Sequence, residues 1–306
     1  MQSLWMIVAA LLFSLMGVAV KLASSQYNTW EIVLYRGLIG VIVMGGMIAL
    51  QARRTRVSIR DALSTPRVAM HLTRGISGTL SVLLWFFSIA GLPIATAMTI
   101  SSSSPLFIGA WIAWTAHRAG NRIDVMMMIA LLGGFIGVML LLQPTLASDQ
   151  WIFAILGTTG AALTAIAYLS VKALGVAGEP NARIVFYFSA MNALAGLAGA
   201  SFFGFHALDL RGLALLACVG ISAALAQLAM TRAYASGGTL LTANLGFTSI
   251  VFSSIWGIAI FGDVIRLDST IGMVVIIASG VLATLMTARA LKRTQSEPDQ
   301  EVRTYP

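Results

Sequence analysis

The chain has 306 residues, of which 58% are hydrophobic and only 10% are charged. A soluble domain carries roughly 25% charged residues, and one of this size could not bury so much apolar surface. The composition therefore excludes a soluble protein and predicts that lipid surrounds most of the chain. The net charge of +8 does not indicate a nucleic-acid partner, because the basic residues lie in short segments between apolar runs. The single cysteine, Cys218, excludes a disulfide within one chain.

Ten apolar runs follow one another along the chain, each long enough to cross a bilayer as a helix. Their approximate limits are 4–24, 30–51, 70–90, 94–116, 124–144, 150–173, 182–204, 211–235, 239–262 and 269–290. The first run has no Lys or Arg before it and is longer than the apolar part of a signal peptide, so we expect a retained helix. Residues 291–306 are polar and are expected to form a disordered cytoplasmic tail. The sequence thus predicts an all-α integral membrane protein.

Basic residues gather on one side of the predicted membrane, which sets its orientation. With both termini cytoplasmic, the cytoplasmic segments hold Arg53, Arg54, Arg56, Arg60, Arg67, Arg118, Arg122, Lys172, Arg183, Arg289, Lys292 and Arg293, with Arg74 just beyond the loop that contains Arg67. The loops on the opposite side keep only Arg211 and Arg266. This bias predicts a multi-pass protein of the inner membrane with both termini in the cytoplasm.

The second half of the chain repeats features of the first. Gly75-Ile76-Ser77 recurs 145 positions later as Gly220-Ile221-Ser222, and the same offset carries Trp111 onto Trp256. Because each half holds an odd number of spans, the two units would enter the membrane from opposite sides. Such inverted repeats around a central cavity are typical of secondary transporters that work by alternating access. The predicted five-helix units are residues 1–145 and 146–290.

Several of these features, taken in order, resemble one known family. Lys21 ends the first span, the aromatic-arginine pair Tyr35-Arg36 lies in the second, and the stretch Leu-Pro-Ile-Ala-Thr-Ala…Ser-Pro-Leu-Phe runs from Leu92 to Phe107. The chain resembles the EamA-type members of the drug/metabolite transporter superfamily over roughly residues 4–290. The resemblance implies ten helices around a central cavity, in a protein that moves small organic metabolites, amino acids or drugs, often outward.

Arg36 is the first candidate for binding the solute. A charge at the centre of a bilayer costs about 2.5–3.5 kcal/mol or more, so it usually faces a cavity or a partner. A guanidinium in a cavity would bind a carboxylate or phosphate of the solute. The equivalent residue of the second half is Phe188, which indicates that the fold does not require a charge here. The alternatives are an ion pair with Glu31, one turn earlier, and a side chain that reaches the membrane surface.

Four more candidates lie well inside predicted spans. Gln227 and Asn244 are amides whose first-half counterparts are not amides, and this asymmetry favours a cavity. Trp85 and Tyr168 are aromatics that would form walls for a flat or amphipathic solute. The alternative for the amides is a hydrogen bond between neighbouring helices, and the alternative for the rings is packing.

Two further candidates lie at a span end and at a span interruption. Lys21 would contact the solute or, like its counterpart Lys172, neutralise carbonyls at a helix C-terminus. Ser101 precedes Pro105, whose missing N–H leaves the carbonyl of Ser101 without its helical partner. This segment predicts an interruption of the fourth span, serving as a hinge, as a polar contact for the solute or only as a packed kink.

Other classes of function lack their residues. Gly75-Ile76-Ser77-Gly78 matches the Gly-x-Ser-Gly of rhomboid-type proteases, but no histidine lies at membrane depth to act as its base. We find no metal-ligand cluster or phosphate-binding loop in the sequence, so we expect no metal, no cofactor, no ATP-driven step and no enzyme activity. A channel would need a ring of polar residues, and the polar residues inside the spans are too few.

We therefore expect a secondary transporter for a small organic solute, and specifically an exporter. An uptake carrier for a vitamin, a nucleoside-like compound or a carboxylated metabolite is the alternative, and an intramembrane enzyme is a remote one. The expected partners are the solute and the lipid bilayer, with a homodimer left open. No Asp or Glu lies deep in a span, so the sequence shows no carboxylate relay for protons and leaves the coupling, the substrate and the direction of transport open.

Overall fold

The computed structural model describes residues 2–92, 94–120, 124–144, 146–262 and 267–296. This part of the chain consists of helices joined by turns and short loops, and no strand occurs in it. The all-α class predicted from the sequence is confirmed. The helices are η1 Gln2–Leu4, α1 Trp5–Ala23, α2 Thr29–Thr55, α3 Ile59–Leu63, α4 Val68–Gly91, α5 Ile94–Ser101, α6 Ser104–Arg118, α7 Val125–Leu142, α8 Trp151–Val176, α9 Asn181–Phe203, α10 Leu210–Ser236, α11 Thr239–Leu245, α12 Thr248–Phe261 and α13 Leu267–Ser296.

Within the described residues, eight helical segments are long and apolar enough to cross a membrane. They are α1, α2, α7, α8, α9, α10, the α11–α12 pair and α13. Many of their large apolar side chains, such as Ile42, Leu194 and Phe202, are exposed on the outside of the bundle. Lipid is the medium in which such side chains are stable, so this is a multi-pass membrane protein.

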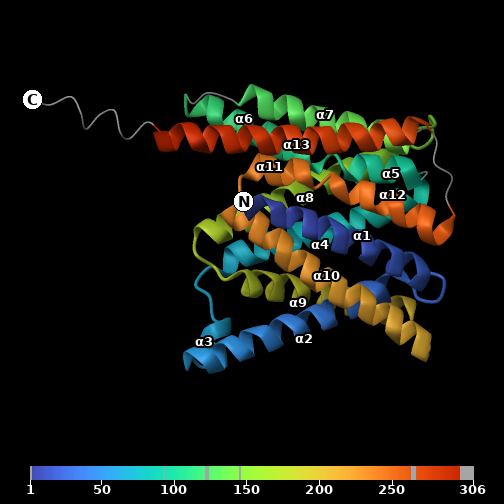
Figure 1. Cartoon of the computed structure of the whole chain (residues 1–306). Helices are drawn as coiled ribbons and strands as arrows, with labels where there is room; N and C mark the ends of the chain where they lie inside the picture. The colour runs from blue at the N-terminus through green and yellow to red at the C-terminus, as the bar shows by residue number, and fades with distance from the viewer. Residues whose placement is uncertain (1, 93, 121–123, 145, 263–266, 297–306) are drawn as a thin grey trace, which may run out of the picture.

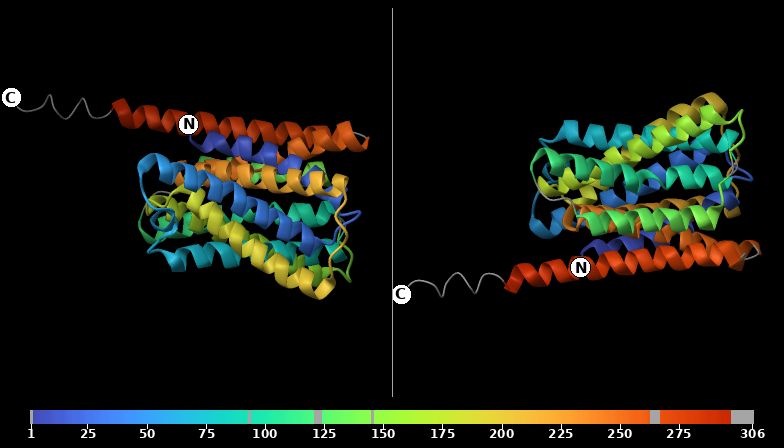
Figure 2. Two further views of the ribbon diagram at one scale, coloured as in Figure 1. Left: turned by 90° about the horizontal axis from the view of Figure 1, so that it is seen from below. Right: turned by 90° about the horizontal axis from the view of Figure 1, so that it is seen from above.

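The helices lie side by side in one bundle, as Figures 1 and 2 show. In Figure 1, α1 begins and α13 ends toward the same end of the bundle, which we call the N-terminal end. The most extensive contacts join α2 to α9, α4 to α8, α1 to α10 and α7 to α13. Each pair takes one helix from the first 145 residues and one from the remainder. The two halves of the chain therefore interleave and do not form separate bodies.

Glycines let α2 and α9 approach each other closely. A Cβ at Gly37 of α2 would overlap the backbone of Ala193 in α9, and a Cβ at Gly196 of α9 would overlap the backbone of Leu34 in α2. In lipid no hydrophobic driving force holds helices together, because the lipid tails are as apolar as the side chains. Small residues instead let the backbones approach closely and gain dispersion energy. This contact brings Arg36, the neighbour of Gly37, against α9.

The fourth predicted span is interrupted, as the sequence indicated. α5 ends at Ser101 and α6 begins at Ser104, with Pro105 in the first turn of α6. Pro is tolerated there because the first amides of a helix have no helical partner. The Ser103 hydroxyl donates to the carbonyl of Ile100 at 2.6 Å, so one carbonyl near the break is satisfied by a side chain.

The ninth predicted span is interrupted as well, which the sequence analysis did not predict. α11 ends at Leu245 and α12 begins at Thr248. No proline is present. Instead, the hydroxyl of Thr248 donates to the carbonyl of Leu245 at 2.7 Å, and that of Ser249 donates to the carbonyl of Gly246 at 2.8 Å. At both breaks, serine or threonine hydroxyls thus donate to nearby backbone carbonyls and compete with the backbone amides for them.

Two helices run past their predicted ends. α2 continues to Thr55 and stops at Arg56, which adopts a left-handed conformation with φ 56°. α13 continues to Ser296, into the segment predicted to be a disordered tail. Residues 297–306, the rest of that predicted tail, lie outside the described residues.

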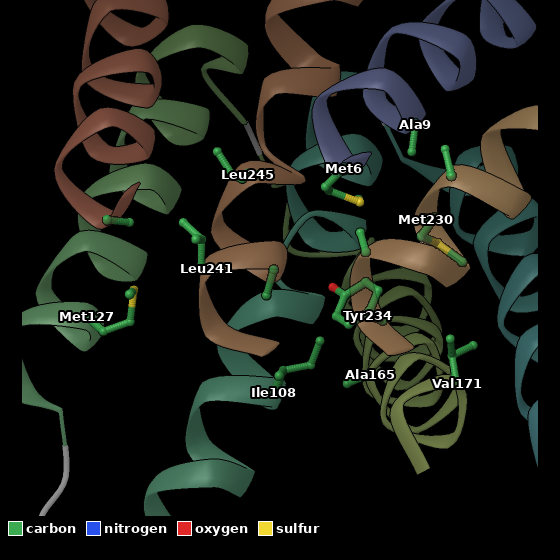
Figure 3. Close-up of a cluster of buried hydrophobic side chains, with 14 of the residues drawn as sticks. Met6, Ala9, Ile108, Met127, Ala165, Val171, Met230, Tyr234, Leu241 and Leu245 are labelled. Carbon is green, nitrogen blue, oxygen red and sulfur yellow. The ribbon is translucent and has the colours of Figure 1, made fainter. Parts of the chain in front are cut away.

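A large apolar cluster fills the N-terminal end of the bundle. Figure 3 shows side chains from the start of α1, from α6, α7 and α8, from the end of α10 and from α11 converging there. They include Met6, Ile108, Met127, Val171, Met230, Tyr234 and Leu241, all of them buried. This packing joins helices of both halves of the chain at the N-terminal end of the bundle.

Candidate functional site

A small cavity lies between α2, α9 and α10, next to the close contact of α2 with α9. Its volume is about 10 Å³, which is room for roughly one water molecule. An organic solute could enter it only if the helices around it moved apart. The lining residues are Arg36, Gly37, Phe188, Ser189, Asn192, Ala223, Ala224 and Gln227.

Two arginines flank the aromatic ring in this cavity. The ζ carbon of Arg74 lies 3.8 Å from the ring centroid of Phe188, and that of Arg36 lies 6.0 Å from the same centroid. Arg74 is only 3% exposed, and Arg36 is half-buried. The two guanidinium groups are close enough to repel each other. The aromatic face attracts both cations, but it supplies no negative charge.

The polar atoms around the arginines are incompletely paired. Arg74 Nη2 donates to Gln227 Oε1 at 3.2 Å, and Asn192 Nδ2 donates to the carbonyl of Phe188 at 2.8 Å. Arg74 Nε and Asn192 Oδ1 are buried with no hydrogen-bond partner among the described residues. Buried polar atoms without partners are rare and costly in native proteins. A hydrogen-bond donor, Arg74 Nε, and an acceptor, Asn192 Oδ1, are therefore both unused near the cavity.

Tyr168 belongs to the same neighbourhood. Its ring packs on that of Tyr234, with centroids 5.0 Å apart, and its hydroxyl interacts electrostatically with both Arg36 and Arg74. Three of the seven residues singled out from the sequence, Arg36, Tyr168 and Gln227, are therefore brought together by three different helices, α2, α8 and α10.

The other four candidates lie away from the lining of this cavity. Asn244 donates to the Ser279 carbonyl at 3.1 Å and accepts from the Ser279 hydroxyl at 3.0 Å, which ties α11 to α13. The Lys21 ammonium lies 3.7 Å from the ring centroid of Phe261, at the far end of α1. Trp85 lies in α4 where this helix packs on α8, and Ser101 ends α5 at the helix break.

The lysine that repeats Lys21 has the structural role considered for both. Lys172 Nζ donates to the carbonyl of Gly237 at 3.0 Å and to that of Ala235 at 3.4 Å. These carbonyls lie at the C-terminal end of α10, where a cation is favourable. Lys172 therefore fixes the end of α10 against α8.

A buried carboxylate holds each end of the bundle. At the N-terminal end, α8 terminates with Gly178 in a left-handed conformation (φ 82°), and the amide of Glu179 bonds back to the carbonyl of Leu174. This reversal, of the Schellman type, directs the side chain of Glu179 into the bundle, where it is 1% exposed.

Around Glu179 the loop before α4 and the start of α9 supply its partners, which together we call the Glu179 cluster. Thr65 Oγ1 donates at 2.6 Å, Arg67 Nη1 at 3.3 Å and Arg183 Nη1 at 3.1 Å, while His71 Nε2 lies 3.5 Å away. Burial raises the pKa of the Glu179 carboxyl, but the hydrogen bonds from Thr65 and Arg67 and the charge of Arg183 outweigh it, so this pKa lies below the ordinary value.

At the opposite end, the Glu31 cluster joins the start of α2 to the loop after α9. Asn28 and Glu31 form a reciprocal capping box at the α2 N-terminus. The Glu31 carboxylate also accepts from the His206 amide at 2.6 Å and lies 2.7 Å from His206 Nδ1. Asn28 Nδ2 donates to the carbonyl of Gly204 at 3.0 Å. Glu31 is thus engaged with His206 and does not form the ion pair with Arg36 that was the structural alternative.

Comparison with known proteins identifies the family. A sequence model of the EamA-like transporter family matches residues 1–143. The pseudopaline exporter CntI of Pseudomonas aeruginosa is 30% identical over 258 residues, which cover 84% of this chain and 87% of the exporter. The chain belongs to the EamA-like transporter family.

Other relatives of this EamA-like transporter carry different solutes. A riboflavin transporter of Vibrio cholerae is 26% identical over 96% of each chain, and an S-adenosylmethionine uptake transporter of Rickettsia bellii is 23% identical over 96% of this chain and 95% of its own. A crystal structure superposes with a TM-score of 0.74 at 19% identity and covers 94% of this chain and 98% of that one, which supports the fold. The predicted transporter class is confirmed, and the relatives' names point to small-molecule solutes.

The sequence analysis missed Arg74 and Asn192 as site residues. Arg74 lies about two turns inside α4 and its equivalent by the 145-residue offset is the apolar Val219. The reasoning applied to Arg36 would have found it, but Arg74 was counted with the basic residues of the preceding loop. Asn192 lies in the seventh span with no charge beside it, so only its place in the lining of the cavity reveals it.

Proposed function

We propose that this EamA-like transporter is a secondary carrier that exports a small organic solute by alternating access. The observation that carries the proposal is the small cavity at Arg36, which is lined by helices of both halves of the chain. Arg36 orients an anionic group of the solute, while Gln227 and Tyr168 shape the pocket. Asn244, Lys21, Ser101 and Trp85, which lie away from the cavity, act through helix packing and helix movement.

The proposal includes ten membrane spans arranged as two inverted repeats. We take α4 and the α5–α6 pair as the third and fourth spans. If the two halves are then exchanged, the contact between α4 and α8 becomes the contact between α10 and α1. The contacts between α2 and α9 and between α7 and α13 are unchanged by this exchange. The breaks before Ser104 and Thr248 lie 144 positions apart, close to the repeat offset. The basic residues near the N-terminal end support its placement on the cytoplasmic side of the inner membrane.

The two carboxylate clusters would serve as the gates. Each ties the corner before the second helix of one half to a loop of the other half, and the two lie at opposite ends of the bundle. Release of the Glu179 cluster would open the cavity to the N-terminal side, and release of the Glu31 cluster would open it to the other. Alternating access requires this pair of interfaces to open in turn.

The direction of transport rests on gradients and coupling. Export is favoured here by the 30% identity to an exporter, and uptake is the second candidate because the riboflavin and S-adenosylmethionine relatives carry vitamin- and nucleoside-like solutes. Purified protein in liposomes, loaded with a solute panel, tests the proposal with and without a pH gradient. Flux that is driven by the gradient indicates proton coupling, and flux independent of it indicates facilitated diffusion or exchange.

The matched variant for this assay is Arg36→Ala. We expect flux to fall at least about tenfold, because a charge-assisted contact to the solute is lost. The protein should still insert and elute as a single species, since no described residue forms a hydrogen bond or ion pair with Arg36. Loss of folded protein would return Arg36 to a structural role, and undiminished flux would remove it from the site.

A further inference from the structure

The cavity holds more positive charge than a single carboxylate can balance. The ζ carbons of Arg36 and Arg74 lie 6.0 and 3.8 Å from one ring centroid, so the two charges are at most about 10 Å apart, in a medium without the mobile ions that screen charges in water. Neither arginine forms an ion pair with any described residue, and Glu31 is engaged by His206. Two like charges in this position repel each other and need a counter-charge.

The hydrogen-bonding groups left over around the arginines complete a description of the ligand. Arg74 Nε is an unused donor and Asn192 Oδ1 an unused acceptor, both buried. Gln227 accepts a hydrogen bond from only one nitrogen of the Arg74 guanidinium, Nη2. An anionic oxygen would satisfy Nε, and a hydroxyl or amine of the same ligand would satisfy Asn192.

We propose that Arg36 and Arg74 together select a solute with two negative charges, either a small dicarboxylate or a phosphate monoester, that also carries a hydroxyl or amine. This inference rests on the proposed transport function and assigns the substrate class of the same site. Arg74, held on the ring of Phe188 and by Gln227, supplies one cation and Arg36 the other. The ligand bridges α2 and α4, which belong to one half, and meets α9 and α10 from the other.

Bridging of this kind would link binding to movement. In the absence of a dianion the repulsion between the two guanidinium groups favours separation of α2 from α4, and a bound dianion draws them together. A monoanion neutralises only one charge and leaves the other unbalanced. The site therefore discriminates more by the number of negative charges on the ligand than by its shape. When a monoanion binds, one desolvated guanidinium group is left without a counter-charge, and this lowers the affinity relative to a dianion.

The test uses the full-length protein purified in detergent and follows thermal unfolding, because a ligand of the folded state raises the melting temperature by mass action. The ligands are matched pairs at neutral pH and constant ionic strength: succinate with monomethyl succinate, malate with lactate, and glycerol 3-phosphate with glycerol. We expect at least one dianion to bind about tenfold or more tightly than its partner. The pair that responds distinguishes a dicarboxylate from a phosphate, and malate should exceed succinate through Asn192.

The variants Arg36→Gln and Arg74→Gln should each abolish the preference for the dianion and retain binding of the monoanion. Arg232→Gln is the matched control, because Arg232 is exposed at the end of α10 and bonds Gln2 at 3.1 Å outside the cavity. Should Arg74→Gln fail to fold, Arg74→Lys keeps the charge and should keep the preference, and Arg36→Gln alone still decides the point.

A folded wild-type protein that binds no dianion better than its partner overturns the inference, and so does a preference that survives in Arg36→Gln. Flux assays separate this failure from failure of the proposed function. If liposomes move a neutral or zwitterionic solute without any dianion preference, transport stands and the dianion site does not. If the folded protein moves no solute at all, the proposed function itself is contradicted.

Discussion

The two ends of the molecule are closed by the same arrangement with different chemistry. At each end a carboxylate side chain that is 1% exposed binds a loop of the other half of the chain. Glu179 meets two arginines and the buried His71, whereas Glu31 meets two backbone amides and one histidine. His206 is also 55% exposed, so solvent screens its contact. The comparison indicates that the N-terminal end is held more firmly than the opposite end.

The difference follows from residues that also predict the orientation of the chain in the membrane. Arg67 and Arg183 belong to the basic loops that predict a cytoplasmic N-terminal end. In the structure they also neutralise a buried carboxylate. One set of charges thus supports both the predicted orientation and the closure of this end, and the opposite end, which has fewer basic residues, is held by a capping box and a histidine.

The largest effect on this comparison should come from Glu179→Ala. Removal of the carboxylate leaves two arginines and the half-buried loop before α4 without their common partner. We expect a loss of about 3 kcal/mol in the free energy of unfolding, as for other broken buried pairs, seen as a lower melting temperature in detergent. Asp61→Ala is the matched control, because Asp61 is an exposed acid of the nearby helix α3 whose carboxylate accepts a hydrogen bond from Ser58, and it should cost less than ~0.5 kcal/mol. Equal losses in both variants would show that Glu179 does not hold this end.

The pH dependence of Glu179→Gln should sharpen the same point. The folded-state pKa of Glu179 lies below the ordinary value of 4.5, so the unfolded chain takes up this proton first as the pH falls. The carboxylate stabilises the wild type, by about 2 kcal/mol over the variant, at any pH above roughly 4.5. This advantage should shrink below that pH and vanish once the pH is under the folded-state pKa. Melting curves from pH 7 downward measure it, with Asp61→Asn as the control. A gap between wild type and variant that does not close in acid would contradict the assignment.

Sequence patterns predicted the all-α membrane class because its determinants are local. Apolar run length gives the spans, and turn residues such as Ser236-Gly237-Gly238 give their ends. The break at Ser101 was predictable since Pro105 removes a donor. The break after Leu245 was not, because it depends on hydroxyls of Thr248 and Ser249 that in most helices bond backward without interrupting them.

The site was only partly predictable, because contacts between helices are not encoded in spacing. Arg36 could be found from its depth and from Phe188 at the equivalent position, yet nothing in the sequence says that this same Phe188 lies beside it. Gln227 was singled out because the equivalent residue of the first half is not an amide, and in the structure it accepts a hydrogen bond from Arg74. Asn244 looked identical by the same criterion but bonds Ser279 in another helix. Depth and polarity identify candidate site residues, but only the packing of the helices shows which of them lie at the cavity and which bond two helices together.

The smallest effect should come from His206→Ala at the end opposite to Glu179. The Glu31 carboxylate keeps its bonds from the backbone amides of Asn28 and residue 206, so only one half-exposed contact is lost. We expect less than about 1 kcal/mol in the free energy of unfolding, measured beside Leu208→Ala, an exposed neighbour in the same loop. Because this contact belongs to one of the two proposed gates, flux should change more than stability does, with the exit rate on that side rising. If His206→Ala were as destabilising as Glu179→Ala, the two ends would be equally held, and the unequal charges around the two carboxylates would not decide which gate opens first.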